Sequence, residues 1–198
     1  LVGGSALTLV GMAVNSVNGI IAEQVGSVAV GVATLSYGAG LNTQNGSMVP
    51  LGADGSIRIH NNGAQSVDVA VDAFGYTSAD PTAGGGYTPL VTAQVFNATI
   101  KPGQTRPVAI AGTNGIPLGR VDSVLVSAIA MDYTSSGTFD LTPSPTAKAL
   151  PSVRFNTAES GPRSATALTR VGSDGRIYIT NTGDAAATAR INVQGWFA

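Results

Sequence analysis

The sequence predicts an all-β protein made of two tandem antiparallel β-sandwich modules of jelly-roll-like type, with no significant helix. Three observations predict this fold class. Apolar and polar residues alternate with the period of two that is typical of half-buried strands. Asp-Gly and Asn-x-Gly turn signals separate short strand-like runs. Finally, the segment LGADGSIRIHNNG at 51–63 occurs again, without a gap, as VGSDGRIYITNTG at 171–183, which is 120 positions later.

Each copy of this segment predicts a turn, a strand and a second turn. Ile57 and Ile59 alternate with polar residues, and two isoleucines do the same in the second copy. The Asp-Gly pair before each strand favours a tight turn, because Asp tolerates and Gly prefers a positive φ. A further alternating strand follows in each copy, over 67–76 and 187–196. These two strands end in a glycine followed by a large aromatic residue: Gly75-Tyr76 and Gly195-Trp196.

The likeness between the two halves continues upstream in the same order, but it is weaker. Residues 5–14 resemble residues 123–132 at an offset of 118, and the same offset matches Leu35 with Val153. Residues 87–120, which contain two strand-like runs, have no counterpart in the first half. We therefore expect the first module to be completed by another chain, or to be built from different residues in its early part. A sandwich without these strands would leave backbone groups unpaired.

The predicted organisation is a first β module at 1–77, a linker at 78–86 and a second, complete β module at 87–198. The linker is rich in Gly, Pro and small residues and nearly uncharged, as connecting segments often are. The chain begins with Leu rather than Met, which is expected of a processed product or a fragment.

Composition excludes several classes of function. Charged residues make up 11% of the chain and the net charge is −1, so no basic field exists to bind nucleic acid. The absence of cysteine excludes disulfides, thiolate metal sites and cysteine nucleophiles. The apolar runs reach about ten residues, half the length that a membrane helix needs, so we expect no membrane insertion.

The titratable residues suggest no catalytic site, no metal site and no cofactor. His60 is the only histidine and is expected to be an exposed strand residue. Asp68 and Asp72 lie about 13 Å apart along one strand face, which is too far for a pair of glycosidase carboxylates. Asp54 and Asp174 each precede a glycine, and turn formation explains them without a calcium ion. We therefore expect a protein that is not an enzyme.

Aromatic residues are the candidates for ligand binding, since aromatic faces stack on sugars in many recognition surfaces. The candidates are Trp196, Tyr76, Tyr178, Tyr133 and Tyr87. Tyr76 and Trp196 occupy matching positions in the two copies, which favours the alternative interpretation that both cap a core.

The motifs YTPLVTAQVFNATI, KPGQTRPVAIAG, GIPLGRVDSVLVSAIAM, GSDGRIYITNTG and INVQGWF together resemble a β-rich repeat of secreted and cell-surface proteins of actinobacteria. The likeness covers residues 87–197 well and 5–77 in part. The chain departs from the repeat at 94–100, where QVFNATI replaces a charged Arg-x-Leu-Asp-Thr-Arg stretch. Its terminal Asp is present as Asp72 but is Asn192 in the second copy. The resemblance implies an extracellular accessory or surface-coat module, appended to hydrolases or arrayed in tandem.

The expected function is that of a non-catalytic structural or adhesive protein of the cell surface. Neighbouring copies are the expected partners, joined into a fibre or sheath by strand complementation between subunits. The alternative is a polysaccharide- or cell-wall-binding accessory module of a secreted hydrolase.

Overall fold

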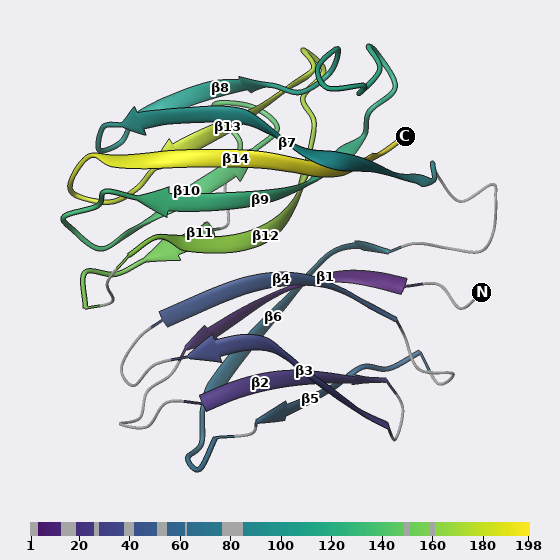
Figure 1. Cartoon of the computed structure of the whole chain (residues 1–198), viewed down its shortest axis with the longest axis vertical. Helices are drawn as coiled ribbons and strands as arrows, with labels where there is room; N and C mark the ends of the chain where they lie inside the picture. The colour runs from purple at the N-terminus through teal and green to yellow at the C-terminus, as the bar shows by residue number, and fades with distance from the viewer. Residues whose placement is uncertain are drawn as a thin grey trace. The chain divides into compact units, whose positions relative to one another are not determined.

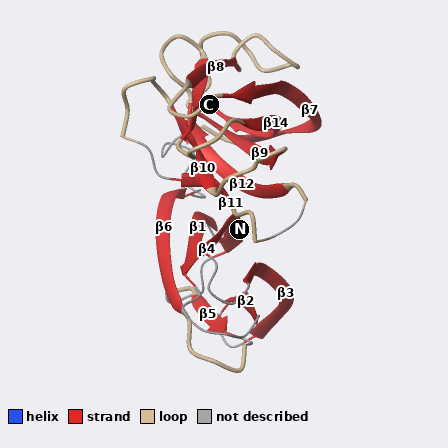
Figure 2. Cartoon of the chain, turned by 90° about the vertical axis from the view of Figure 1, so that its left-hand side faces the viewer, coloured by secondary structure: helices blue, strands red, loops and turns tan. Residues whose placement is uncertain are grey.

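The computed structural model describes residues 4–12, 19–25, 28–37, 42–50, 55–61, 63–76, 85–148, 151–158 and 161–198. These residues form strands β1 to β14 and no helix, which confirms the all-β prediction (Figure 2). The chain divides into two compact units, Leu1–Gly84 and Gly85–Ala198. Most of the segment predicted as a linker, residues 78–84, lies outside the described residues.

The second unit is a sandwich of two four-stranded antiparallel sheets (Figure 1). One sheet has the strand order β12-β9-β14-β7 and the other β11-β10-β13-β8. The strands are β7 (Tyr87–Ile100), β8 (Thr105–Ala109), β9 (Ser123–Met131), β10 (Gly137–Thr142), β11 (Pro151–Phe155), β12 (Arg163–Arg170), β13 (Arg176–Asn181) and β14 (Ala187–Phe197).

Alternate residues of these strands form the core of the second unit. Ile177 and Ile179 are fully buried on β13, as their alternation predicts, and β14 buries every second residue from Ala187 to Gly195. The largest fully buried side chain is Phe139, whose ring centroid lies 5.1 Å from that of Phe155. Burial of each such side chain contributes about 1.5–3 kcal/mol, so the inward-facing residues account for the period of two seen in the sequence.

The first unit consists of two three-stranded antiparallel sheets, with the strand orders β4-β1-β6 and β3-β2-β5. Its strands are β1 (Gly4–Met12), β2 (Gly19–Val25), β3 (Val28–Tyr37), β4 (Asn42–Pro50), β5 (Arg58–Asn61) and β6 (Asp68–Tyr76). The order β4-β1-β6 matches β12-β9-β14, and β3-β2-β5 matches β11-β10-β13. The repeated sequence therefore corresponds to a repeated strand plan.

The pairing registers also correspond. On β6, Gly75 pairs with β1 directly after an irregularity, and Gly195 pairs with β9 after an irregularity at the same place in β14. Leu35 lies opposite β2 as Val153 lies opposite β10, and both are buried, so the expected match at an offset of 118 is confirmed.

The expected offset of 118 is wrong for β1. Thr8 pairs with Asp72 on β6, and Ser127 pairs with Asn192 on β14, so Thr8 matches Ser127 at an offset of 119. A one-residue slip exchanges the two faces of a strand, and only cross-strand pairing fixes the register where sequence identity is low.

Candidate functional site

The main candidate site is the outer edge of the first unit, formed by β5 and β6, which we call the open edge. In the second unit, β14 pairs on both sides, with β9 and β7, and β13 pairs with β10 and β8. Among the described residues of the first unit, β6 pairs with β1 alone and β5 with β2 alone. The two strands without a counterpart are β7 and β8, which come from the segment that the sequence comparison left unmatched.

Apolar side chains that are buried in the second unit are exposed at the open edge. Ile59 is 39% exposed, whereas its counterpart Ile179 is 0% exposed. Val71 is 40% exposed, whereas its counterpart Ile191 is 0% exposed. Each open-edge residue thus keeps the apolar character of a core residue without the cover that a core position has.

A pair of turn glycines shows the same difference. Gly55 and Gly175 have nearly equal positive φ values, 74° and 75°, which favour glycine in both turns. At Gly175, an added Cβ would lie 2.9 Å from Cβ of Ala111, and the backbone N–H of Ala111 donates to the Gly175 carbonyl at 2.9 Å. At Gly55, no atom of the described residues lies within 4 Å of that position. The positive φ is therefore retained in the first unit, while no described residue takes the place that Ala111 has beside Gly175.

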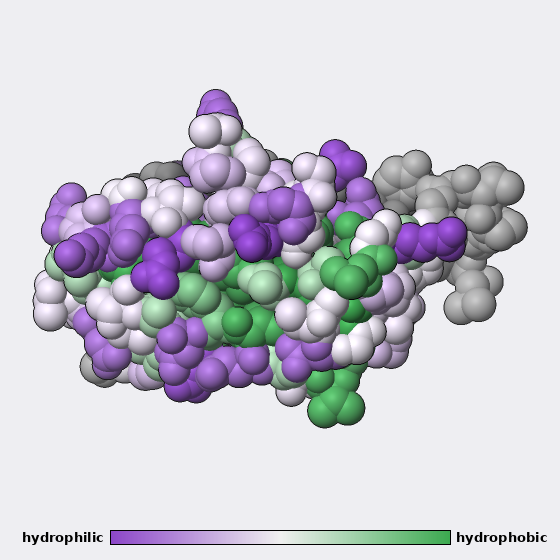
Figure 3. Space-filling view, turned by 90° about the horizontal axis from the view of Figure 1, so that it is seen from above, coloured by the Kyte–Doolittle hydropathy of each residue, from purple (hydrophilic) through white to green (hydrophobic). Residues whose placement is uncertain are grey.

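The second unit presents apolar surface of its own. Val91 on β7 is 94% exposed and Leu118 is 81% exposed. Figure 3 shows apolar residues, in green, between polar residues on the face seen from above. Scattered exposed apolar residues are common on monomeric proteins, so a test of the open edge needs a control on this surface.

The aromatic candidates are distributed over different parts of the fold. Trp196 and Tyr178 lie on β14 and β13, which belong to different sheets. Trp196 pairs with Val124 at the start of β9, while Tyr133 follows the end of β9 at Met131. This spacing corresponds to about 23 Å of strand rise. Tyr76 ends β6, and its side chain lies outside the described ones. The structure therefore does not bring Trp196, Tyr178 and Tyr133 into one surface.

Most of the aromatic groups of the second unit have internal partners. Trp196 is half-buried and packs against the core, although its buried indole Nε1 has no hydrogen-bond partner among the described residues. The Tyr133 hydroxyl donates to the Gly161 carbonyl at 2.7 Å, and its ring lies 4.9 Å from that of Phe155. The Tyr178 hydroxyl donates to Asp174 Oδ2 at 2.6 Å. These contacts fix the rings in place.

The contact between Asp174 and Tyr178 shifts the pKa of both side chains. The hydrogen bond from Tyr178 holds the pKa of Asp174 below its usual value, with a smaller contribution from the backbone N–H of Arg176. The same bond raises the pKa of Tyr178. Both shifts favour a charged Asp174 and a neutral Tyr178 at neutral pH. The pair therefore stabilises a turn and is not poised for proton transfer.

Asp140 is the buried carboxylate among the described residues of the second unit. Burial raises its pKa, while the Thr138 hydroxyl, which donates to Oδ1 at 2.6 Å, and the charge of Arg154 act in the opposite direction. A raised carboxylate pKa can mark a general acid, but Asp140 has Thr138 and Arg154 as partners within the sheet β11-β10-β13-β8. Its environment is that of a structural carboxylate.

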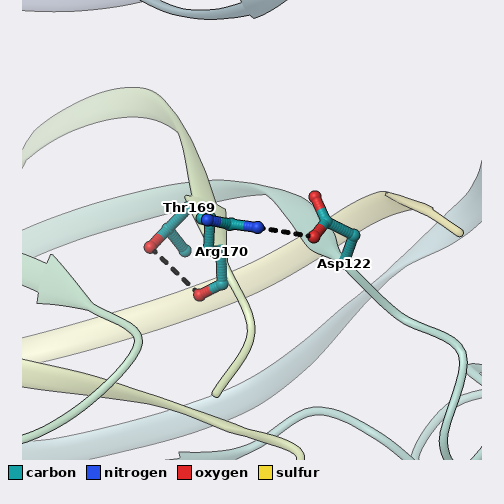
Figure 4. Close-up of polar contacts among 3 residues, drawn as sticks. All are labelled: Asp122, Thr169 and Arg170. Carbon is teal, nitrogen blue, oxygen red and sulfur yellow. Dashed lines mark hydrogen bonds and ion pairs between the residues drawn. The ribbon is translucent and has the colours of Figure 1, made fainter. Parts of the chain in front are cut away.

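Two of the remaining charged candidates, His60 and Asp68, lie at exposed positions. His60 is exposed on β5, and Asp68 is exposed at the start of β6. Asp54 and the Asp72 side chain lie outside the described residues. Figure 4 shows an exposed ion pair, in which Arg170 Nη2 lies 3.1 Å from Asp122 Oδ1. No group of three His, Cys, Asp or Glu residues with metal-binding geometry occurs within the described ranges.

The comparisons with known proteins identify no relative: no protein-family model matches the chain, and no curated protein matches it. The part of the chain that the structure describes contains no apolar helix of membrane-spanning length. The open edge is thus defined by comparison of the two halves of the molecule with each other. Sequence reasoning signalled it through the unmatched segment 87–120, but it did not identify Ile59 and Val71 as the exposed residues.

Proposed function

We propose that this chain is a non-catalytic structural or adhesive β-repeat protein of the extracellular surface, and that its subunits join by strand complementation into a fibre or sheath. One observation carries the proposal. The same strand plan is used twice, and among the described strands of the first copy β6 and β5 lack the neighbours that β7 and β8 provide for β14 and β13 in the second.

Physical chemistry supports association at this edge. An edge strand carries a row of backbone N–H and C=O groups that can pair with another chain. Addition of a strand would bury Ile59 and Val71 and would satisfy those backbone groups at the same time. Proteins that avoid such pairing place charges or prolines along the edge. On β6, Asp68 is an exposed charge, but Val69 is also partly exposed and Val71 is exposed.

The titratable groups support a role without catalysis. Asp174, Tyr178 and Asp140 each have a partner within their own sheet or turn. His60 is exposed on a strand. General acid–base catalysis requires a titratable group within hydrogen-bond reach of a reacting atom, usually beside a second catalytic group. The described residues bring no such set together.

The experiment uses the native protein, examined by sedimentation velocity over a range of concentrations and by electron microscopy. We expect assemblies that grow with concentration, and we expect Ile59→Asp to abolish them by placing a charge on the open edge. Leu118→Asp, the same kind of change at an exposed position of the second unit outside residues 87–109, is the matched control and should leave assembly intact. A monodisperse monomer at every concentration would contradict the proposal.

A second candidate function, polysaccharide binding, is supported by one corner of the second unit. Tyr87 on β7 is partly exposed, and its ring centroid lies 5.0 Å from that of Phe197. Trp196 is adjacent in the chain. Retention on cell-wall polysaccharide that is lost on Tyr87→Ala would favour this function, and equal elution of both proteins would exclude it.

A further inference from the structure

We propose that the open edge is a binding site for a β-arch with the pattern of residues 87–109, supplied by a polypeptide outside residues 1–198. By β-arch we mean two consecutive strands that enter two facing sheets. This inference rests on the proposed function and adds to it the chemistry and the register of the segment that is bound.

The second unit shows what such an arch does. β7 pairs with β14 in one sheet and β8 pairs with β13 in the other, so a single segment extends both sheets. Ile100 at the end of β7 and Val108 on β8 are buried in the core. The turn between them is attached to β13, since the N–H of Gly103 donates to the Asn181 carbonyl at 2.8 Å.

The register in the second unit specifies the register at the open edge. Ile191 lies opposite Phe96 on β7, so Val71 should face an aromatic or large apolar residue of the arch. Ile177 lies opposite Val108 on β8, so Ile57 should face a β-branched residue. The arch therefore needs apolar residues at the positions of Phe96 and Val108. Opposite Ile179, the counterpart of Ile59, β8 carries Arg106.

A glycine on β6 provides independent evidence for the first strand of the arch. A Cβ added at Gly195 would lie 2.3 Å from the hydroxyl oxygen of Tyr87 and 2.4 Å from its ring. The φ of Gly195 is not positive, so it is the approach of Tyr87 that requires glycine there. Gly75 occupies the same position on β6, although Tyr87 has no counterpart in residues 1–84. By this correspondence, Gly75 would accept an aromatic ring at the start of the incoming strand.

The chain's own arch is not the occupant. Residues 1–198 contain two sandwich units but one 87–109 segment, and that segment is already built into the second unit. If one copy donated its arch to another, it would close one edge and open an equivalent one. Exchange of this segment among copies of residues 1–198 therefore leaves one open edge per copy, so we assign the arch to residues of a neighbouring subunit that lie outside 1–198.

One difference between the two copies gives the site a specificity of its own. In the second unit, Thr99 on β7 and Thr188 on β14 share a hydrogen bond of 3.2 Å between their hydroxyl groups. Asp68 takes the place of Thr188 at the open edge and is exposed. The arch residue opposite Asp68 should therefore be a donor or a cation. Opposite-charge cross-strand pairs contribute about 0.2–1 kcal/mol, which is a preference of about 1.4- to 5-fold.

The first experiment uses a labelled synthetic peptide with the sequence of residues 87–109, titrated with the full chain. We expect saturable one-to-one binding, together with slower amide hydrogen exchange in β5 and β6 and unchanged exchange in β13 and β14. A T99K peptide should bind 1.4- to 5-fold more tightly than the unchanged peptide. Protection confined to β13 and β14 would overturn the proposal, because it would mean that the peptide exchanges with the chain's own arch.

Gly75→Ala tests the aromatic position. It should weaken peptide binding at least tenfold, because the new Cβ would meet the first tyrosine of the peptide. Gly86→Ala is the matched control, since nothing lies within 4 Å of its Cβ position, and it should bind normally. Equal binding by Gly75→Ala and the unchanged chain would refute the assigned register.

A fusion keeps the test decisive if the free peptide is too weakly ordered to bind. Residues 87–122 are placed directly before residue 1, which raises the local concentration of the arch to about the millimolar range. The amides of β5 and β6 should then exchange at least tenfold more slowly than in the unfused chain, and unchanged exchange would overturn the inference.

The proposed function and the arch-binding inference can be refuted separately. Arch binding without assembly of the native protein removes the proposed function alone. Assembly that depends on Ile59, without arch binding, removes this inference alone.

Discussion

Substitution of Asn181 by alanine tests how the arch is attached in the complete unit. The Asn181 side chain is fully buried and makes three hydrogen bonds: its Nδ2 donates to the carbonyls of Ile100 and Ala185, both at 2.9 Å, and its Oδ1 accepts from the N–H of Gly183 at 2.9 Å. Each bond contributes about 1 kcal/mol net, so Asn181→Ala should lower the free energy of unfolding by about 3 kcal/mol.

Trp196 provides the assay, because it is the only tryptophan and lies on β14 of the same unit. With a urea slope of about 1–2 kcal/mol per molar, the loss should move the midpoint of the fluorescence transition down by about 1.5–3 M. Asn97→Ala is the control. Asn97 is exposed on β7, so its removal should change stability by at most about 0.5 kcal/mol. A loss below about 1 kcal/mol for Asn181→Ala would refute the reasoning.

Three further outcomes follow from the same contacts. Tyr178→Phe should raise the pKa of Asp174 toward its ordinary value, measured by NMR titration of the carboxyl carbon. The pKa of Asp174 is lower in the folded than in the unfolded state, so Asp174 stabilises the fold above its unfolded-state pKa. This stabilisation is lost as the pH falls through the folded-state pKa. An Asp174 titration that is the same in Tyr178→Phe and in the unchanged chain would contradict the prediction. Gly195→Ala should lower the free energy of unfolding by about 1–3 kcal/mol, because its new Cβ would collide with Tyr87. The loss should be clearly smaller in a Tyr87→Ala background. Strictly additive losses in the double mutant would show that the Cβ at position 195 does not collide with the Tyr87 ring. Asp122→Ala should cost at most about 1 kcal/mol, because its ion pair with Arg170 is solvent-exposed, and a thermal unfolding shift equivalent to more than about 2 kcal/mol would disprove this (Figure 4).

The features predicted correctly from sequence are those set by local chemistry. Alternation placed Ile177 and Ile179 in the core, and the Asp-Gly signal located the turn at Gly175, where φ is 75°. The pairing register between strands was harder to predict from the sequence. The register of β1 was misjudged by one residue, because few identical residues align it with β9 and strand neighbours decide its position.

The candidate site could be predicted only in outline. The absence of a counterpart for residues 87–120 indicated that strands were missing, but it did not indicate where. Their place depends on β7 and β8 being the outer strands of two different sheets, which is a property of sheet order. The aromatic candidates failed to converge for a related reason, since Trp196 and Tyr178 lie on different sheets. Residue type identified them as candidates, whereas strand order determined their positions.

The residues of the open edge argue against a surface that evolved only to face water. A free edge would be better protected by lysine, proline or an inward-pointing charge at the positions of Ile59 and Val71, because exposed β-branched strands promote unwanted pairing. These positions instead hold residues of the type that the second unit buries. The proposed arch accounts for this difference, because strands in the register of β7 and β8 would cover Val71 and Ile59 as β7 and β8 cover β14 and β13.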